Sequence, residues 1–288
     1  MSIRIADVTK DFPSKPRAID HLTTTFQTGM TGLLGANGAG KTTLMRIVCG
    51  ILRPTSGEVF VDGASISQNS ALLDHKRHLG YLPQDLMLYG NLTPREFLEY
   101  VSLLKEMTDR RRIRREADEL IERVGLADVA DRRIGGFSGG MRRRVGIAQA
   151  LTGDPRTIVV DEPTAGLDPE ERMRFRSLLS TLGGDRTVIL STHILDDVAQ
   201  TCPRVCVMRE GRILYSGPTV DLVHHGEGVT YLLIAPGPPP EGMHVVNAVS
   251  SASGTLYRVV GSVPPAGARP VEPTIEDGYI AVMNRVCG

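Results

Sequence analysis

The sequence has no tryptophan, four cysteines in 288 residues and no excess of either sign of charge, with 33 basic and 33 acidic side chains. The absence of tryptophan decides nothing. The net charge near zero argues against nonspecific electrostatic binding of nucleic acid, because such binding needs a basic surface. No window approaches the roughly 20 apolar residues of a membrane helix, and the first residues lack the apolar centre of a signal peptide. We therefore expect a cytosolic chain without a membrane span of its own.

The four cysteines are scattered along the chain, at Cys49, Cys202, Cys206 and Cys287. The spacing of Cys202 and Cys206 is similar to that of two metal ligands, but no second pair of cysteines or histidines completes a site. We therefore expect the cysteines to be small buried hydrophobic residues in a reducing compartment.

One glycine-rich segment carries the strongest functional signal. Its residues are Gly35, Ala36, Asn37, Gly38, Ala39, Gly40, Lys41 and Thr42, followed by Thr43. They match G-x-x-x-x-G-K-[ST], in which backbone N–H groups cradle phosphates, the lysine adds a positive charge and the hydroxyl can ligate Mg²⁺. An apolar run at 30–34 precedes the loop, and residues 43–50 have helical spacing. This segment predicts a nucleoside triphosphate site between a strand and a helix.

The rest of the chain alternates short apolar runs with amphipathic stretches. We predict antiparallel strands within 2–27, a hairpin near 58–63, helices over 94–104 and 114–124, buried strands at 158–160 and 187–190, and a helix opened by 168–171 with Phe175, Leu178, Leu179 and Leu182 on its core face. Buried strands alternating with helices predict an α/β fold around a mainly parallel sheet.

The composition changes near Gly226. Four prolines and a glycine at 236–240 exclude regular structure there, and strands are expected at 245–249 and 256–260, around a turn at 251–254, with a closing helix over 275–286. We predict a main domain over 1–225 and an accessory region over 226–288.

Polar residues that could bind a metal or take part in catalysis follow the predicted buried strands. Asp161 and Glu162 end one strand, where Asp161 can hold Mg²⁺ and Glu162 can polarise a water molecule. Gln84 follows a short strand, and His193 stands at the tip of another. Asp168 closes the segment 165–168.

A second anion-binding element precedes an arginine-rich helix. Its hydroxyl and glycine N–H groups, from Ser138, Gly139 and Gly140, are expected at the helix N-terminus. At these motifs, over roughly 3–223, the chain resembles the ATP-binding-cassette family. Beyond the cassette, the strand and helix pattern after Gly226 predicts a small C-terminal α+β appendage. The resemblance implies a P-loop NTPase cassette with an N-terminal antiparallel β subdomain and a helical subdomain at about 86–136. It also implies that two cassettes pair head to tail, so that each ATP lies between the loop at 35–42 and the other copy's 138–140.

The resemblance implies a role for each motif. Lys41 holds the β- and γ-phosphates, and Thr42 binds Mg²⁺, which Asp161 can also hold. Gln84 senses the metal and the attacking water and counts with Glu162, the general base, and His193, which contacts the γ-phosphate, among the catalytic residues. Asp168 links the two sites, and Phe12 stacks on adenine. Plainer readings exist: Glu162 as a helix-capping acid, His193 as a core histidine, Gln84 as loop polarity and Phe12 as ordinary core.

The form of the second anion-binding element refines the resemblance. The segment Ser-Gly-Gly-Met-Arg-Arg-Arg at 138–144 is similar to a branch of exporter ATPases, although Phe137 and Met141 depart from the commoner Leu and Gln. This branch implies a separate transmembrane permease and a peripheral location at the cytoplasmic face of the membrane. The alternative is a soluble cassette ATPase acting on ribosomes or DNA; a regulator without turnover is disfavoured by Glu162. The basic run at 110–115 is expected to be a solvated helix face, with a contact to lipid head groups or to a membrane partner as the alternative.

Overall fold

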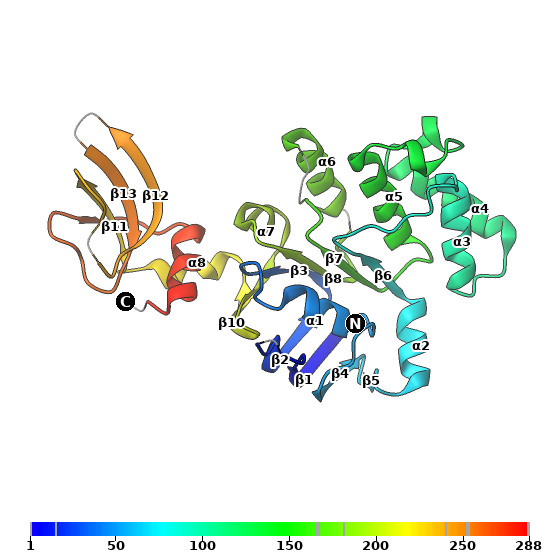
Figure 1. Cartoon of the computed structure of the whole chain (residues 1–288), viewed down its shortest axis with the longest axis horizontal. Helices are drawn as coiled ribbons and strands as arrows, with labels where there is room; N and C mark the ends of the chain where they lie inside the picture. Colours follow the sequence, from blue (N-terminus) through cyan, green and yellow to red (C-terminus); the bar gives the residue numbers. More distant parts are fainter. Residues whose placement is uncertain are drawn as a thin grey trace.

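The computed structural model describes residues 2–14, 16–164, 168–180, 182–239, 241–251 and 254–286. Three sheets organise it (Figure 1). The central sheet lies in the middle of the view, the helices α3 and α4 lie at one end, and a small sheet with helix α8 lies at the other. No helix among the residues described is both long and apolar enough to cross a membrane.

The first sheet is antiparallel, in the order β2-β1-β4-β5. Its strands are β1 (Ser2–Lys10), β2 (Ile19–Gln27), β4 (Ser56–Val61) and β5 (Ala64–Ser65). In β2, buried and exposed side chains alternate, as expected of a strand with one covered face. The predicted antiparallel strands within 2–27 and the hairpin near 58–63 are confirmed.

The central sheet has the order β10-β9-β3-β8-β7-β6 and is parallel except for β10. Its strands are β3 (Gly29–Leu34), β6 (Leu79–Leu82), β7 (Thr157–Asp161), β8 (Thr187–Thr192), β9 (Arg204–Arg209) and β10 (Arg212–Pro218). Every residue of β7 and β8 is buried, as their apolar runs predict. The β9–β10 hairpin was not predicted, although its two-residue turn has positive φ at both Glu210 and Gly211, which suits a hairpin.

Five helices belong to the part of the chain that contains these two sheets. They are α1 (Lys41–Val48), α2 (Asn69–Arg77), α5 (Gly139–Leu151), α6 (Pro169–Ser180) and α7 (Leu195–Thr201). Helix α1 starts at Lys41, two residues before the predicted run, and Gly50 follows it with φ +64°. Its buried Leu44, Ile47 and Val48 join one core with the first sheet. Helix α6 ends at Ser180, so Leu182, assigned to its core face, is buried beyond the helix.

Helices α3 (Pro94–Leu104) and α4 (Arg110–Arg123) form the helical region with two short 3₁₀ turns at Ala127–Val129 and Ile134–Gly136. Thr93 and Glu96 cap α3 reciprocally, as its sequence predicts. Helix α4 begins four residues before the predicted start, because the Asp109 side chain accepts hydrogen bonds from two N–H groups of the first turn. The arginines at 110–115 are therefore exposed on this helix, around a buried Ile113.

The C-terminal sheet has the order β12-β13-β11-β14. It consists of β11 (Thr230–Ala235), β12 (His244–Ser251), β13 (Gly254–Val260) and β14 (Arg269–Pro270), and a 3₁₀ helix (Val220–Gly226) leads into it. Strand β11, a Tyr-Leu-Leu-Ile run, was missed. The predicted closing helix is α8 (Ile275–Asn284), two residues shorter than expected. Residues 252 and 253 of the predicted turn lie outside the described residues.

Helix α8 joins this sheet to the rest of the chain. A Cβ on Gly278 would lie 1.8 Å from the Leu222 carbonyl oxygen, so the helix lies directly on the 3₁₀ segment. Arg258 on β13 forms hydrogen bonds with the fully buried Asp277 carboxylate. These contacts make the region after Gly226 an α+β unit, as predicted from its sequence.

Candidate functional site

The glycine loop joins β3 to α1 and adopts conformations that need glycine. Gly38 and Gly40 have φ of +83° and +103°, a region that residues with a Cβ rarely enter. A Cβ on Gly40 would lie 2.3 Å from the Ala18 carbonyl oxygen, and one on Gly35 would lie 2.3 Å from that of Met208. The loop therefore curls against its neighbours, with its N–H groups at the N-terminus of α1.

A cavity of about 340 Å³ opens at this loop. It is lined by Ala18, Asn37, Gly38, Gly40, Lys41, Thr42, Thr43, Gln84 and Glu162. Seven of these residues were predicted to bind nucleotide or metal from the sequence, and Gln84 and Glu162 come from segments far from the loop. The parallel sheet brings them together because β6 and β7 end at the same edge as β3.

Two buried opposite charges meet at the cavity. Lys41 and Glu162 are each 6% exposed, and Lys41 Nζ lies 3.3 Å from Glu162 Oε1. This is an ion pair without hydrogen-bond geometry, because no partner is found for Oε1 among the described residues. Lys41 Nζ also donates to the carbonyl oxygens of Gly35 and Ala36, at 2.6 and 3.2 Å. The lysine is thus held under the loop with its charge directed into the site.

His193 lies on the other side of Glu162. Its Nδ1 is 2.8 Å from Glu162 Oε2, and its side chain is 45% exposed. The core-histidine reading is therefore wrong. The two oxygens of the Glu162 carboxylate contact Lys41 and His193, and no helix N–H of the described residues donates to them, so the interpretation of Glu162 as a helix cap is also wrong.

Asp161 is fully buried at the end of β7. Its Oδ1 accepts from Ser191 Oγ at 2.8 Å, while Oδ2 has no hydrogen-bond partner in the described part of the chain. An orphaned carboxylate oxygen fits Mg²⁺, which takes few protein oxygens and keeps water and phosphate ligands. Thr42 and Gln84, the other predicted metal-binding residues, line the cavity. Asp161 does not line the cavity itself, so its reach toward a metal would pass through water.

The other predicted site residues lie away from this cavity. Ser138 caps α5 by accepting from Met141 N–H at 3.2 Å, and it is exposed together with Gly139. Gly140 follows it in the helix. Asp168 accepts from Glu171 N–H at 2.8 Å, as its capping pattern predicts. Residues 165–167, the rest of that motif, lie outside the described residues.

Phe12 is half-buried and belongs to no hydrophobic core cluster of the described residues. The Lys10 ammonium lies 5.2 Å from the centre of its ring. The ordinary-core reading of Phe12 is therefore wrong, and its predicted stacking on adenine stays a prediction.

Three of the four cysteines are buried and free, at Cys49, Cys202 and Cys206. Burial raises the pKa of the Cys202 thiol to about 12. Cys287 lies outside the described residues. The interpretation of the first three as small hydrophobic residues is confirmed.

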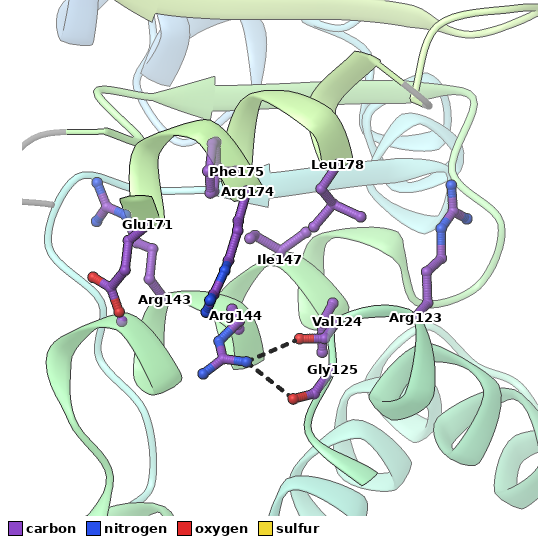
Figure 2. Close-up of a pocket in the computed structure, with 11 residues that line it drawn as sticks. Arg123, Val124, Gly125, Arg143, Arg144, Ile147, Glu171, Arg174, Phe175 and Leu178 are labelled. Carbon is purple, nitrogen blue, oxygen red and sulfur yellow. Dashed lines mark hydrogen bonds between the residues drawn. The ribbon is translucent and has the colours of Figure 1, made fainter. Parts of the chain in front are cut away.

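One residue of the site was missed. Arg143, 8% exposed on α5, donates to the carbonyl oxygens of Gln84, Glu162 and Pro163. A signal existed, because Arg143 shares a helix face with Gly140 and Ile147, where a charge is out of place. Figure 2 shows it in the wall of a second hollow of about 320 Å³, between α5, α6 and the end of α4.

A glycine loop between a parallel strand and a helix, with a buried lysine and an acid from a neighbouring strand, defines a P-loop nucleotide-binding protein. The family model for ABC transporters matches residues 19–165. The chain belongs to this family of ATP-binding proteins, as the sequence resemblance implies.

Named relatives agree with this assignment. The chain is 40% identical over 190 residues to an uncharacterized ABC transporter ATP-binding protein, YxlF, of Bacillus subtilis, covering 66% of this chain and 62% of that protein. It is 35% identical over 243 residues to the Nod factor export ATP-binding protein I of Rhizobium meliloti, covering 84% and 71%. A solved structure, the dimeric bacterial ABC transporter cassette MJ0796, superposes with a TM-score of 0.69 at 25% identity, covering 75% of this chain and 98% of that one. The predicted fold class is confirmed.

Proposed function

We propose that the chain is the ATP-hydrolysing subunit of a membrane exporter. The observation that carries the proposal is the Lys41–Glu162–His193 cluster, in which Lys41 and Glu162 line the glycine-loop cavity and His193 contacts Glu162. A buried acid held between a lysine and a histidine, beside a phosphate-binding loop, is the arrangement that hydrolysis of a bound triphosphate needs.

Each residue of the cavity has a defined task in this proposal. The backbone from Gly35 to Thr43 and the Lys41 ammonium hold the phosphates of ATP. Thr42, Gln84 and Asp161 would hold Mg²⁺, which would supply positive charge against the phosphates. Phe12 supports the adenine.

Glu162 acts as general base. Its Oε1 is the atom placed to accept a proton from the attacking water, because it has no hydrogen-bond donor in the described structure. The His193 imidazole holds Oε2, which keeps the carboxylate oriented. His193 also stands at the rim of the site, where it can contact the γ-phosphate. Positioning and fixed charges supply most of the rate enhancement.

The exposed element at Ser138, Gly139 and Gly140 points to a paired cassette. It is an anion site at a helix N-terminus that contributes nothing to the cavity of its own chain. In the proposed head-to-tail pair, it faces the ATP of the other copy, and Asp168 links the two sites. The cassette comprises residues 1–225, with the helical subdomain at 86–136, and the unit over 226–288 is an accessory to it.

The permease is a separate membrane protein, and the chain is peripheral at the cytoplasmic face. Support comes from the name of the Nod factor export relative and from the neutral net charge, which disfavours DNA or ribosomes as partners.

The test is ATP hydrolysis by the purified chain, followed by affinity purification of the full chain from detergent-solubilised membranes. We expect Mg²⁺-dependent phosphate release that is lost in Glu162→Gln, and a multispanning membrane protein in the purified complex. Ribosomal proteins or DNA in its place would overturn the exporter assignment. If the wild-type chain released no phosphate from ATP even in complex with its membrane partner, its assignment as the hydrolysing subunit would be overturned.

A further inference from the structure

Arg143 is a buried cation in the middle of α5, the helix that Ser138 caps. Burial lowers the pKa of its guanidinium, although nearby carboxylates, Asp161 first, oppose the shift. An arginine in such a place destabilises the fold unless its N–H groups are well satisfied. Its hydrogen bonds therefore show what it is used for.

The guanidinium holds the backbone of two separate segments of the site. Nε donates to the Pro163 carbonyl oxygen and Nη1 to the Gln84 carbonyl oxygen, each at 2.8 Å, while Nη2 donates to the carbonyl oxygen of Glu162. The planar fork of an arginine can fix several acceptors in one geometry, which a lysine cannot reproduce. Arg143 thus joins the loop after β6 to the segment after β7.

Two of these carbonyl groups belong to residues that line the nucleotide cavity, Gln84 and Glu162. Glu162 has φ +46°, a conformation that a residue with a side chain adopts only when its surroundings hold it there. Its N–H is held by the Ser191 carbonyl, and its carbonyl is held by Arg143. The direction of the Glu162 carboxylate therefore depends on Arg143, although Arg143 does not line the cavity itself.

We propose that Arg143 is a positioning residue that couples the exposed Ser138-Gly139-Gly140 element to the catalytic geometry of its own chain. The inference rests on the proposed head-to-tail pairing. One helix then carries both contacts: its N-terminus faces the partner's nucleotide, and its fifth residue holds Gln84 and Glu162. Engagement of the partner's nucleotide thereby sets the orientation of the base that hydrolyses the chain's own ATP.

The test compares Arg143→Gln with Arg144→Gln in the full-length chain. Arg144, the next residue of α5, donates to the Gly125 carbonyl oxygen at the end of α4 at 2.9 Å, so it controls for loss of charge and of a helix contact. We expect Arg143→Gln to lower kcat by about 10- to 100-fold, the range for losing the position of a base, with the Kd for ATP changed less than threefold. Arg144→Gln should keep kcat within about twofold. Equal kcat values in the two variants would overturn the proposal.

Arg143→Lys keeps the charge but not the fork, and we expect a kcat between those of wild type and Arg143→Gln. If Arg143→Gln does not fold, the test uses Arg143→Lys instead. A several-fold lower kcat at an unchanged Kd for ATP in Arg143→Lys supports the proposal. A kcat for Arg143→Lys equal to that of Arg144→Gln contradicts it. A wild-type chain without hydrolysis would overturn the proposed function itself, which distinguishes the two failures.

The coupling itself is tested by a double-mutant cycle with Ser138→Ala. If Arg143 transmits the engagement of Ser138, the loss of kcat caused by Ser138→Ala should be several-fold smaller in the Arg143→Gln background than in the wild type. Two losses that simply multiply would overturn the coupling.

Discussion

Replacing Glu162 by glutamine tests the reasoning about the site most directly. The substitution keeps the size of the side chain and its contact with His193, and it removes the negative charge from Oε1. The amide cannot take a proton from water at neutral pH. We expect kcat for ATP hydrolysis to fall by about 10²- to 10⁴-fold, the usual contribution of a general base, which corresponds to about 2.7 to 5.4 kcal/mol of activation free energy.

Binding should respond differently from turnover. Lys41 is paired with Glu162 at 3.3 Å, and two unit charges at that distance attract by about 5 kcal/mol at an effective dielectric constant of 20, before desolvation is counted. Phosphate competes with this pair for Lys41. Removing the carboxylate charge should therefore leave the Kd for ATP unchanged or lower it.

Stability should fall moderately. Breaking a buried ion pair costs about 3 to 5 kcal/mol when the remaining charge has no other partner. Lys41 keeps the carbonyl oxygens of Gly35 and Ala36 as acceptors. We therefore expect the free energy of unfolding to fall by about 1 to 3 kcal/mol, with the loss recovered when ATP binds.

The measurements are steady-state phosphate release, equilibrium ATP binding and denaturant unfolding. Glu170→Gln is the matched control, because Glu170 is an exposed glutamate on α6 whose side chain is 71% accessible. It should keep kcat within about twofold, because it lies on the surface. A Glu162→Gln chain that hydrolyses ATP within threefold of wild type would refute the assignment of Glu162 as the base, and one that binds ATP much more weakly would refute the competition between phosphate and Glu162 for Lys41.

Three further predictions concern the loop and the buried groups. The free energy of unfolding of Gly40→Ala should be lower than that of Gly38→Ala by at least about 2 kcal/mol in denaturant unfolding. Both glycines have positive φ, but only a Cβ on Gly40 would meet a backbone atom, the Ala18 carbonyl oxygen at 2.3 Å. Equal effects of the two substitutions would contradict this geometry. Burial lowers the pKa of Lys105 to about 8, so the unfolded chain binds more protons than the folded chain between about pH 8 and the unfolded pKa near 10.5. The free energy of unfolding of the wild type, relative to Lys105→Met, should therefore rise over this pH range. A difference between the two chains that does not change with pH would contradict the prediction. In a Cys287→Ser background, the three buried thiols should resist a water-soluble thiol reagent at pH 8 until the chain is unfolded; rapid labelling of the native protein would contradict their burial.

Local sequence determined much of this protein. The pattern from Gly35 to Thr42 specifies its own loop, because residues with a Cβ rarely adopt the φ of +83° and +103° found at Gly38 and Gly40. The wholly apolar runs at 158–160 and 187–190 predict strands covered on both faces, and Thr93 with Glu96 marks the start of α3. These signals lie within a few residues of the structure they specify. The β9–β10 hairpin and β11 were nevertheless missed.

The tertiary structure decided which distant residues meet. Lys41, Glu162 and His193 come after three different strands, β3, β7 and β8. The order β3-β8-β7 in the parallel sheet brings them to one edge. The bonds from Arg143 to the Gln84 and Glu162 carbonyl oxygens have no counterpart in the spacing of the sequence, because carbonyl acceptors are present at every residue. The glycine-loop pattern alone indicates what the chain binds, whereas the hydrogen bonds of Arg143 on α5 hold the base in place, because they join Glu162 to Gln84, which lies 59 residues from Arg143 in the sequence.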